Sequence, residues 1–561
     1  MLENRMRRAH RTPAFSLVSC ILLSTAGLDA QSPDRSHEAG IPVQSDLVVS
    51  NCSECHEQDA SGRLSRISYM RKSPEGWQTS IRRMVMLNDV QLDPDVARQI
   101  LRYLSNEHGL APEELRPGHF EVERRTIEHR YEADVDTETT CKQCHSLGRV
   151  ITQRRTEEEW GLLLATHRGL YPDVDFQAFR RSGPPAEDED DTRHPMDKAI
   201  AHLSSAFPLE TPEWSAWSAS MRTSRLDGTW AVTGHHPGRG PVFGVVNIRA
   251  AGDEGDFTTQ STLYYPLDDD TAQRTGRSTV YTGYQWRGRS AESGDREQLR
   301  EVMFIERDWR SMWGRWYTGA NDETGLDMKL QRIGSDPVVA GVYPRALRIG
   351  DNRVRVTIFG ANLAETTAGD IDLGPGITIV RVAEAEPHAV SLEVNVSGTA
   401  IRGARDVFVR GGSLAAGVAV YEQVDRIAVT PAAGMARIGG TNFPKQFQQF
   451  EAIGFDDGPD DDSDADDLQL GLVPVTWSLA EYSATYEDDD VGFVGAIDDS
   501  GLFTPALDGP NPQRRGNRNN IGDVWVVATH ARSDGSSIRA RAHLLVTVPL
   551  YIRWDPWGQS P

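Results

Sequence analysis

Residues 52–56 read CSECH, and residues 141–145 read CKQCH. In a C-x-x-C-H sequence, two thiols on one helical turn can form thioethers with the vinyl groups of a porphyrin. The following histidine then lies beneath the iron. A disulfide, a thioredoxin-like redox pair or half of a zinc site also uses paired cysteines, but none requires a histidine after each pair. The motifs therefore predict two covalently bound haem c groups with His56 and His145 as proximal iron ligands.

The cysteine count supports this interpretation. The chain of 561 residues has five cysteines, and Cys20 lies in an N-terminal apolar run. The other four are the predicted haem-attaching residues Cys52, Cys55, Cys141 and Cys144. No cysteine is left for another covalent cofactor once Cys20 is removed with the N-terminal segment.

The N-terminus is typical of a secretory signal peptide over residues 1–30. Four arginines precede the apolar run 14–26, and small residues follow it as far as Ala30. The run is shorter than the roughly 18 apolar residues that span a bilayer. It also continues past Cys20, which disfavours a lipoprotein site there. We expect a periplasmic protein that begins near Gln31 and has no membrane span.

An internal repeat predicts the sixth iron ligands. Met84 lies seven residues after Trp77, and His167 lies seven residues after Trp160. Equivalent positions of a repeated supersecondary unit occupy equivalent places, and methionine and histidine are both common haem ligands. We therefore expect His56/Met84 at the first iron and His145/His167 at the second. Competing candidates are the methionines Met70, Met86 and Met196.

Beyond about residue 222 the sequence changes to short strands of alternating apolar residues, separated by Gly-rich turns. The predicted fold is multidomain, with an N-terminal α-helical dihaem cytochrome c domain followed by three all-β domains. The cytochrome domain covers 31–222, with repeats at about 45–120 and 134–218. A β-barrel covers 226–334, and immunoglobulin-like sandwiches cover 336–423 and 424–548.

The charge balance limits the range of partners. The chain has 59 Lys+Arg and 82 Asp+Glu, a formal net charge of −23. Nucleic acids and anionic membrane surfaces repel such a protein, so neither is expected as the main partner. Neither a Ser–His–Asp arrangement nor a nucleotide-binding glycine loop was found in the sequence.

The order of these parts resembles the alpha subunit of quinohemoprotein amine dehydrogenase over nearly the whole mature length. The resemblance rests on the two haem units with Trp-x6-Met and Trp-x6-His, the barrel, and the two terminal modules. The last module contains the segments VTWSLAEY (475–482) and FTP (503–505). The haem motifs alone occur in many families, and their combination with these segments is far more specific.

This resemblance implies a periplasmic heterotrimer that oxidatively deaminates primary amines. It implies a cysteine tryptophylquinone on a small partner subunit, beside a β-propeller subunit. The alpha chain would pass electrons from the quinone through two haems to an external copper protein or cytochrome c. Since all four mature cysteines are assigned to haem, we expect no catalytic residue for the amine on this chain.

Two other functions remain open. The chain could serve a different periplasmic dehydrogenase as a dihaem electron-transfer subunit, which neighbouring genes would reveal. It could also be a dihaem peroxidase, which requires an iron with an open or switchable position. Addition of peroxide to the half-reduced protein would discriminate the peroxidase.

Overall fold

The computed structural model describes residues 39–119, 131, 133–142, 147–176, 178, 180, 191–252, 254–292, 298–318, 325–459, 464–483 and 488–549. The predicted signal peptide lies outside the described residues, as do Cys144 and His145.

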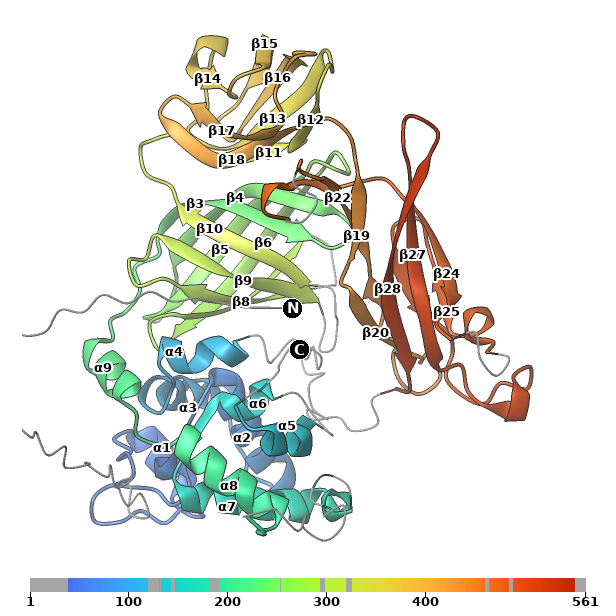
Figure 1. Ribbon diagram of the computed structural model, residues 1–561. Coiled ribbons are helices and arrows are strands. Elements are labelled where there is room, and N and C mark those ends of the chain that lie inside the picture. The colour runs from blue at the N-terminus through green and yellow to red at the C-terminus, as the bar shows by residue number, and fades with distance from the viewer. Residues whose placement is uncertain are drawn as a thin grey trace, which may run out of the picture.

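The N-terminal part is helical, as predicted (Figure 1). Its helices are α1 (Asp46–Cys52), α2 (Pro74–Leu87), α3 (Pro94–Glu107), α4 (Pro112–Leu115), α5 (Val135–Lys142), α6 (Gly148–Ile151), α7 (Glu157–Leu170), α8 (Pro195–Ala206) and α9 (Pro212–Ser220). Two short strands, β1 (Met70–Lys72) and β2 (Gln153–Arg155), precede α2 and α7. Hydroxyl or carboxylate side chains cap α2, α3, α7 and α9 at their first turn, and proline follows several of these caps.

The helical part contains two similar units. Each unit runs from a short helix with cysteine through a short strand and a 14-residue helix to a closing helix. Strands β1 and β2 pair antiparallel and place Arg71 of the first unit opposite Arg154 of the second. Ser73 and Thr156 cap α2 and α7 by accepting a hydrogen bond from the third helical amide. The two units therefore meet at their equivalent strands.

An eight-stranded closed antiparallel barrel follows, in the order β10-β3-β4-β5-β6-β7-β8-β9. Its strands are β3 (Gly228–His236), β4 (Gly240–Ala250), β5 (Asp256–Tyr265), β6 (Asp270–Tyr281), β7 (Gln285–Glu292), β8 (Leu299–Ile305), β9 (Ser311–Thr318) and β10 (Gly325–Arg332). Alternate residues point inward and form one buried cluster with Trp230, Trp286 and Trp316. The predicted barrel is confirmed.

Two further β modules complete the chain. The first has the sheets β11-β13-β16-β15 and β12-β18-β17-β14. Its strands are β11 (Val338–Tyr343), β12 (Ala346–Arg348), β13 (Val354–Ala361), β14 (Ile371–Asp372), β15 (Ile377–Ala385), β16 (Ala389–Val396), β17 (Gly403–Val409) and β18 (Gly412–Tyr421). Buried aliphatic residues of both sheets share one core.

The second module has the sheets β19-β22-β23, β20-β28-β27-β24 and β21-β26-β25. Its strands are β19 (Arg426–Thr430), β20 (Ala433–Arg437), β21 (Gln448–Gln449), β22 (Glu451–Asp456), β23 (Leu468–Leu472), β24 (Thr476–Glu481), β25 (Gly495–Ile497), β26 (Leu502–Pro505), β27 (Gly522–Ala531) and β28 (Ser537–Thr547). The immunoglobulin-like assignment of both modules stays a prediction.

The barrel lies between the helical part and the first β module, and the second β module lies beside the barrel (Figure 1). Phe243 of the barrel stacks on Phe359 of the first module, with ring centroids 4.5 Å apart. His235 of the barrel lies 2.7 Å from the Glu451 carboxylate of the second module. Among the described residues, no helix is both long and apolar enough to cross a bilayer.

Candidate haem-binding site

The first haem motif forms one helical turn at the end of α1. The amides of Cys55 and His56 both donate to the carbonyl of Cys52, at 3.3 and 2.9 Å. His56 Nδ1 lies 2.8 Å from the carbonyl oxygen of Ser65. Because a carbonyl only accepts, the ring donates from Nδ1 and the lone pair is on Nε2, the nitrogen that can coordinate iron.

Neither described cysteine of this motif is in a disulfide. Cys52 is half-buried and Cys55 is exposed, and both are free thiols. Burial raises the pKa of the Cys52 thiol, and the nearby Cys55 raises it further. The two sulfur atoms therefore lie on one turn and are available for thioether bonds.

The second motif is described in part. Cys141 is half-buried in α5. It packs in a cluster with Trp160 and Leu163 of α7. In the first unit Cys52 packs in the same way, in a cluster with Trp77 and Ile81 of α2. Each first cysteine thus lies against the helix that carries the predicted sixth ligand.

The two tryptophans hold these helices in equivalent places. Trp77 and Trp160 are 2% and 1% exposed. Trp77 Nε1 donates to the carbonyl of His108 at 2.9 Å, and Trp160 Nε1 donates to that of Phe207 at 3.3 Å. His108 and Phe207 directly follow the closing helices α3 and α8. The same indole contact therefore joins the ligand helix to the closing helix in both units.

The predicted ligand His167 is oriented by its own helix. Its Nδ1 lies 2.8 Å from the carbonyl of Leu163, which places the lone pair on Nε2. Burial lowers the pKa of His167, and the charges of Arg83 and Arg155 lower it further. These surroundings favour the neutral imidazole, the form that binds a metal.

Met84 is half-buried in α2, and the Asn88 amide nitrogen lies 3.7 Å from its sulfur. The competing methionines lie elsewhere. Met86 is 48% exposed, Met70 is buried in the core of the first unit, and Met196 is buried at the start of α8. Met84 is the methionine at the position equivalent to His167.

Lysine and arginine side chains gather between α2 and α7. Lys72 and Arg155 are 6% and 3% exposed, and each lies over the tryptophan ring of its own unit, at 5.0 and 5.7 Å from the centroid. Lys72 Nζ donates to Ser80 Oγ at 2.7 Å. Arg83 bonds to the Tyr171 hydroxyl. We name Lys72, Arg83 and Arg155 the cation cluster.

Among the described residues, the carboxylate of Glu159 is the counterion of the cation cluster. Glu159 lies 3.4 Å from Arg155 and 2.6 Å from Arg66, so it is shared. Burial lowers the pKa of Lys72 well below its ordinary value, and the charges of Arg155 and Arg83 lower it further. Buried charges that outnumber their counterions are costly, and the three members of the cation cluster share one carboxylate with Arg66, so a further anion is expected here. The propionate carboxylates of haem supply such anions, and the cluster therefore fits the cofactor.

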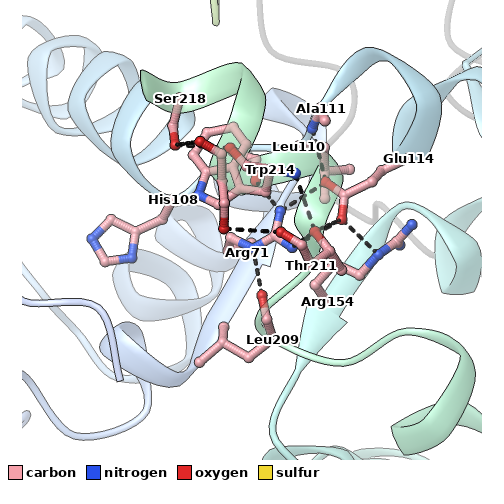
Figure 2. Close-up of polar contacts among 12 residues, drawn as sticks. Arg71, His108, Leu110, Ala111, Glu114, Arg154, Leu209, Thr211, Trp214 and Ser218 are labelled. Atoms are coloured by element: carbon pink, nitrogen blue, oxygen red, sulfur yellow. Dashed lines mark hydrogen bonds and ion pairs between the residues drawn. The ribbon is translucent and has the colours of Figure 1, made fainter. Parts of the chain in front are cut away.

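A second polar network joins the two units at the β1–β2 pair. Figure 2 shows Arg71, Arg154 and Thr211 directed at Glu114. Arg71 donates two hydrogen bonds to Glu114, at 2.8 and 2.9 Å, and Arg154 Nε lies 3.1 Å from the same carboxylate. Burial opposes ionisation of Glu114, but the hydrogen bonds and charge of Arg71, with the charge of Arg154, lower its pKa to about 2.

The sequence analysis missed both groups of charged residues. A signal was present, because Arg71-Lys72 and Arg154-Arg155 stand at the same offset of 83 residues as the two tryptophans. Glu114 has no equivalent acid in the second unit, because Trp214 occupies the corresponding helix. The Arg71 guanidinium carbon lies 5.1 Å from the centroid of the Trp214 ring. Repetition alone therefore did not reveal the carboxylate.

Four family models match the chain. Residues 43–214 match the haem-binding domain of the quinohemoprotein amine dehydrogenase alpha subunit. Residues 223–333, 336–422 and 427–557 match domains II, III and IV of the same subunit. A search of curated proteins found no match.

Several solved structures resemble parts of the chain. A de novo fluorescence-activating β-barrel has 15% identity, covers 19% of this chain and 93% of its own, and has a TM-score of 0.16. The Bacteroides ovatus SGBP-B protein of a mixed-linkage glucan utilization locus has 11% identity, covers 57% and 60%, and has a TM-score of 0.19. The mouse clustered PcdhgC3 EC1-3 has 11% identity, covers 42% and 75%, and has a TM-score of 0.15.

Proposed function

Since the chain belongs to the family of the quinohemoprotein amine dehydrogenase alpha subunit, we propose that it is the haem-carrying electron-transfer subunit of a periplasmic amine dehydrogenase. It would take electrons from a cysteine tryptophylquinone on a small partner subunit, beside a β-propeller subunit. It would deliver them through two haems c to a copper protein or cytochrome c. The observation that carries the proposal is the turn that joins Cys52, Cys55 and His56, with Nδ1 of the histidine bonded to Ser65.

The chain's own residues hold and tune the cofactors. When bound, each haem supplies one iron that accepts and releases one electron. The four cysteines Cys52, Cys55, Cys141 and Cys144 would anchor the two porphyrins. His56 and Met84 would hold the first iron, and His145 and His167 would hold the second. The hydrogen bonds of His56 to Ser65 and of His167 to Leu163 orient the imidazoles.

The surroundings of these ligands exclude water and balance charge. Trp77 and Trp160 close one side of each unit with buried rings. The cation cluster would hold the haem propionates through charge-assisted hydrogen bonds and would favour their ionised form. The substrate chemistry is assigned to another chain, because a Cys–Trp quinone needs a cysteine that haem has not used.

Mass spectrometry of the secreted protein tests the attachment. We expect a chain that begins near Gln31 with the added mass of two haems. Cys55→Ser should weaken the attachment of the first haem while the second haem stays bound. Free thiols at all four positions, or two disulfides in their place, would contradict the proposal.

A further inference from the structure

Four arginines form a row across the outer face of the barrel. In the strand register, Arg277 of β6 lies opposite Arg289 of β7, and Arg289 lies opposite Arg300 of β8. The same row continues through Thr258 of β5 to Arg249 of β4. We name Arg249, Arg277, Arg289 and Arg300 the arginine row. Like charges directly opposite each other on one sheet face destabilise the pair, so this placement has a cost.

The arginine row differs from the neighbouring barrel arginines. Arg239, Arg274, Arg287 and Arg315 each form an ion pair with a described carboxylate. Within the described ranges, no carboxylate lies within ion-pair distance of any member of the arginine row. Arg300 instead lies 5.9 Å from the centroid of the Tyr317 ring. The row is therefore a concentration of positive charge on a chain whose net charge is −23.

The arginine row lines a groove beside the first haem unit. All four members border an open cavity of about 1250 Å³, together with Glu75 and Gln78 of α2. Burial lowers the pKa of Arg289, and the charges of Arg300 and of Arg82 in α2 lower it further. Gln78 precedes the predicted ligand Met84 by six residues, which is about 9 Å along a helix. Helix α2, which forms one side of the groove, is therefore the helix expected to bind the first iron.

From this geometry, we propose that the arginine row docks the carboxylate-rich face of a small redox protein that accepts electrons from the first haem unit. The inference rests on the proposed electron-transfer function and adds the place and chemistry of the partner. In the transfer, the protein loses one electron and a cupric ion in the partner becomes cuprous.

The length of the arginine row favours a protein surface over a small anion. From β4 to β8 the row crosses four strand spacings, about 19 Å along the sheet. One small polyanion covers a fraction of that length, whereas a strip of carboxylates on a folded protein can meet all four guanidinium groups. The rest of this acidic chain repels an acidic partner, so attraction at the row would also direct the partner's orientation.

Stopped-flow kinetics test the docking. The dithionite-reduced holoprotein is mixed with a carboxylate-rich small copper protein at low ionic strength. The triple variant Arg277→Gln/Arg289→Gln/Arg300→Gln should lower the bimolecular rate by about tenfold or more, because steering by opposite charge is lost. A lysine-rich cytochrome c should react with the variant at an unchanged or higher rate. Added salt should slow the wild-type reaction with the copper protein and barely affect that of the variant.

A matched control removes the same charge elsewhere. Arg355, Arg539 and Arg541 are exposed on strands of the two terminal modules, and their joint change to Gln should leave the copper-protein rate near the wild-type value. An equal loss in this control, or no loss in the row variant, would overturn the docking site. So would saturable citrate binding at the row combined with an unchanged copper-protein rate. Absence of haem from the wild-type protein would instead contradict the proposed function, and haem content is measured first for that reason.

Discussion

At the scale of single residues, the two haem units share their supports and differ at one ligand. Trp77 and Trp160 make the same indole hydrogen bond to the closing helix. Seven residues later, Met84 and His167 stand at the same helical position with different chemistry. A thioether favours the ferrous state more than an imidazole does, so the first haem is expected to have the higher potential.

Met84→Ala tests this unlike ligation. The oxidised protein should show a methionine–iron charge-transfer band for one haem, and this variant should abolish the band and leave the second haem's spectrum intact. Met86→Ala is the matched control, because Met86 is on the same helix but exposed, and the band should persist. If Met196→Ala removes the band instead, the repeat does not identify the ligand.

The position of the cation cluster predicts an effect on the reduction potential of the haems. Arg83→Gln should lower the reduction potential of at least one haem on the order of 50 mV, because a nearby positive charge stabilises the more negative, reduced state. Potentiometric titration with optical detection measures this shift. Arg168→Gln is the control, since Arg168 is exposed and paired with Asp175. Equal potentials in wild type and Arg83→Gln would contradict a role of the cluster beside haem.

At the scale of elements, the β1–β2 pair holds the two units together. It is short, and the buried carboxylate of Glu114 between Arg71 and Arg154 reinforces it. Arg71 also donates to the backbone carbonyls of Leu209 and Gly109, which lie beyond the closing helices. The network therefore connects both strands and both closing segments through one guanidinium group.

Glu114→Gln should destabilise the folded protein by about 3–5 kcal/mol, because it leaves two buried guanidinium groups without their counterion. Glu113→Gln is the matched control, since Glu113 is the exposed neighbour and should change stability little. Chemical denaturation of the holoprotein, followed by the haem spectrum and by circular dichroism, measures both variants. A Glu114→Gln variant as stable as wild type would show that the network does not hold the units together.

The same carboxylate predicts a pH dependence. In the folded protein the pKa of Glu114 is lowered to about 2, whereas the pKa of a glutamate in the unfolded chain is about 4.3. Its contribution to stability is therefore complete above the unfolded pKa and declines as pH falls from about 4.3 towards 2. Wild type should lose its stability advantage over Glu114→Gln across this window, as measured by denaturation at a series of pH values. An advantage that is independent of pH would contradict the assignment.

At the scale of the whole molecule, the barrel is the centre to which the other parts attach. The helical part contacts it on one side, where Arg287 of β7 pairs with Glu75 of α2. The two terminal modules contact it on another side through Phe359 and Glu451. The chain thus presents its predicted haem units at one end and the first β module at the other, with the second β module beside the barrel (Figure 1).

A conducting subunit should show no amine turnover when purified alone. In the assembled complex, His167→Ala should leave quinone reduction by amine nearly unchanged and should slow onward transfer to the acceptor. Loss of a ligand changes the potential of a redox centre without altering a substrate pocket on another chain. Stopped-flow measurement follows the two steps separately. Amine oxidation by the isolated chain, or equal losses in both steps, would contradict the assignment.

Local patterns in the sequence predicted the helical part and the barrel, together with the residues that would carry the chemistry. The C-x-x-C-H motifs are contiguous, so Cys52, Cys55 and His56 must share one turn wherever the chain folds. The seven-residue spacings place Met84 and His167 on their helices for the same reason. Alternating apolar residues predicted the strands because sheet faces have a period of two.

The tertiary structure alone decided which distant charges meet. Glu114 joins Arg71 and Arg154 across gaps of 43 and 40 residues in the chain, and the arginine row exists only through the register of β4 to β8. Sequence reveals the period of a strand but not its register with its neighbours, because register depends on barrel closure and on packing of the inward-facing residues. The residues for two haem units were therefore determined locally, while their pairing and the charged groove beside them were determined by the fold.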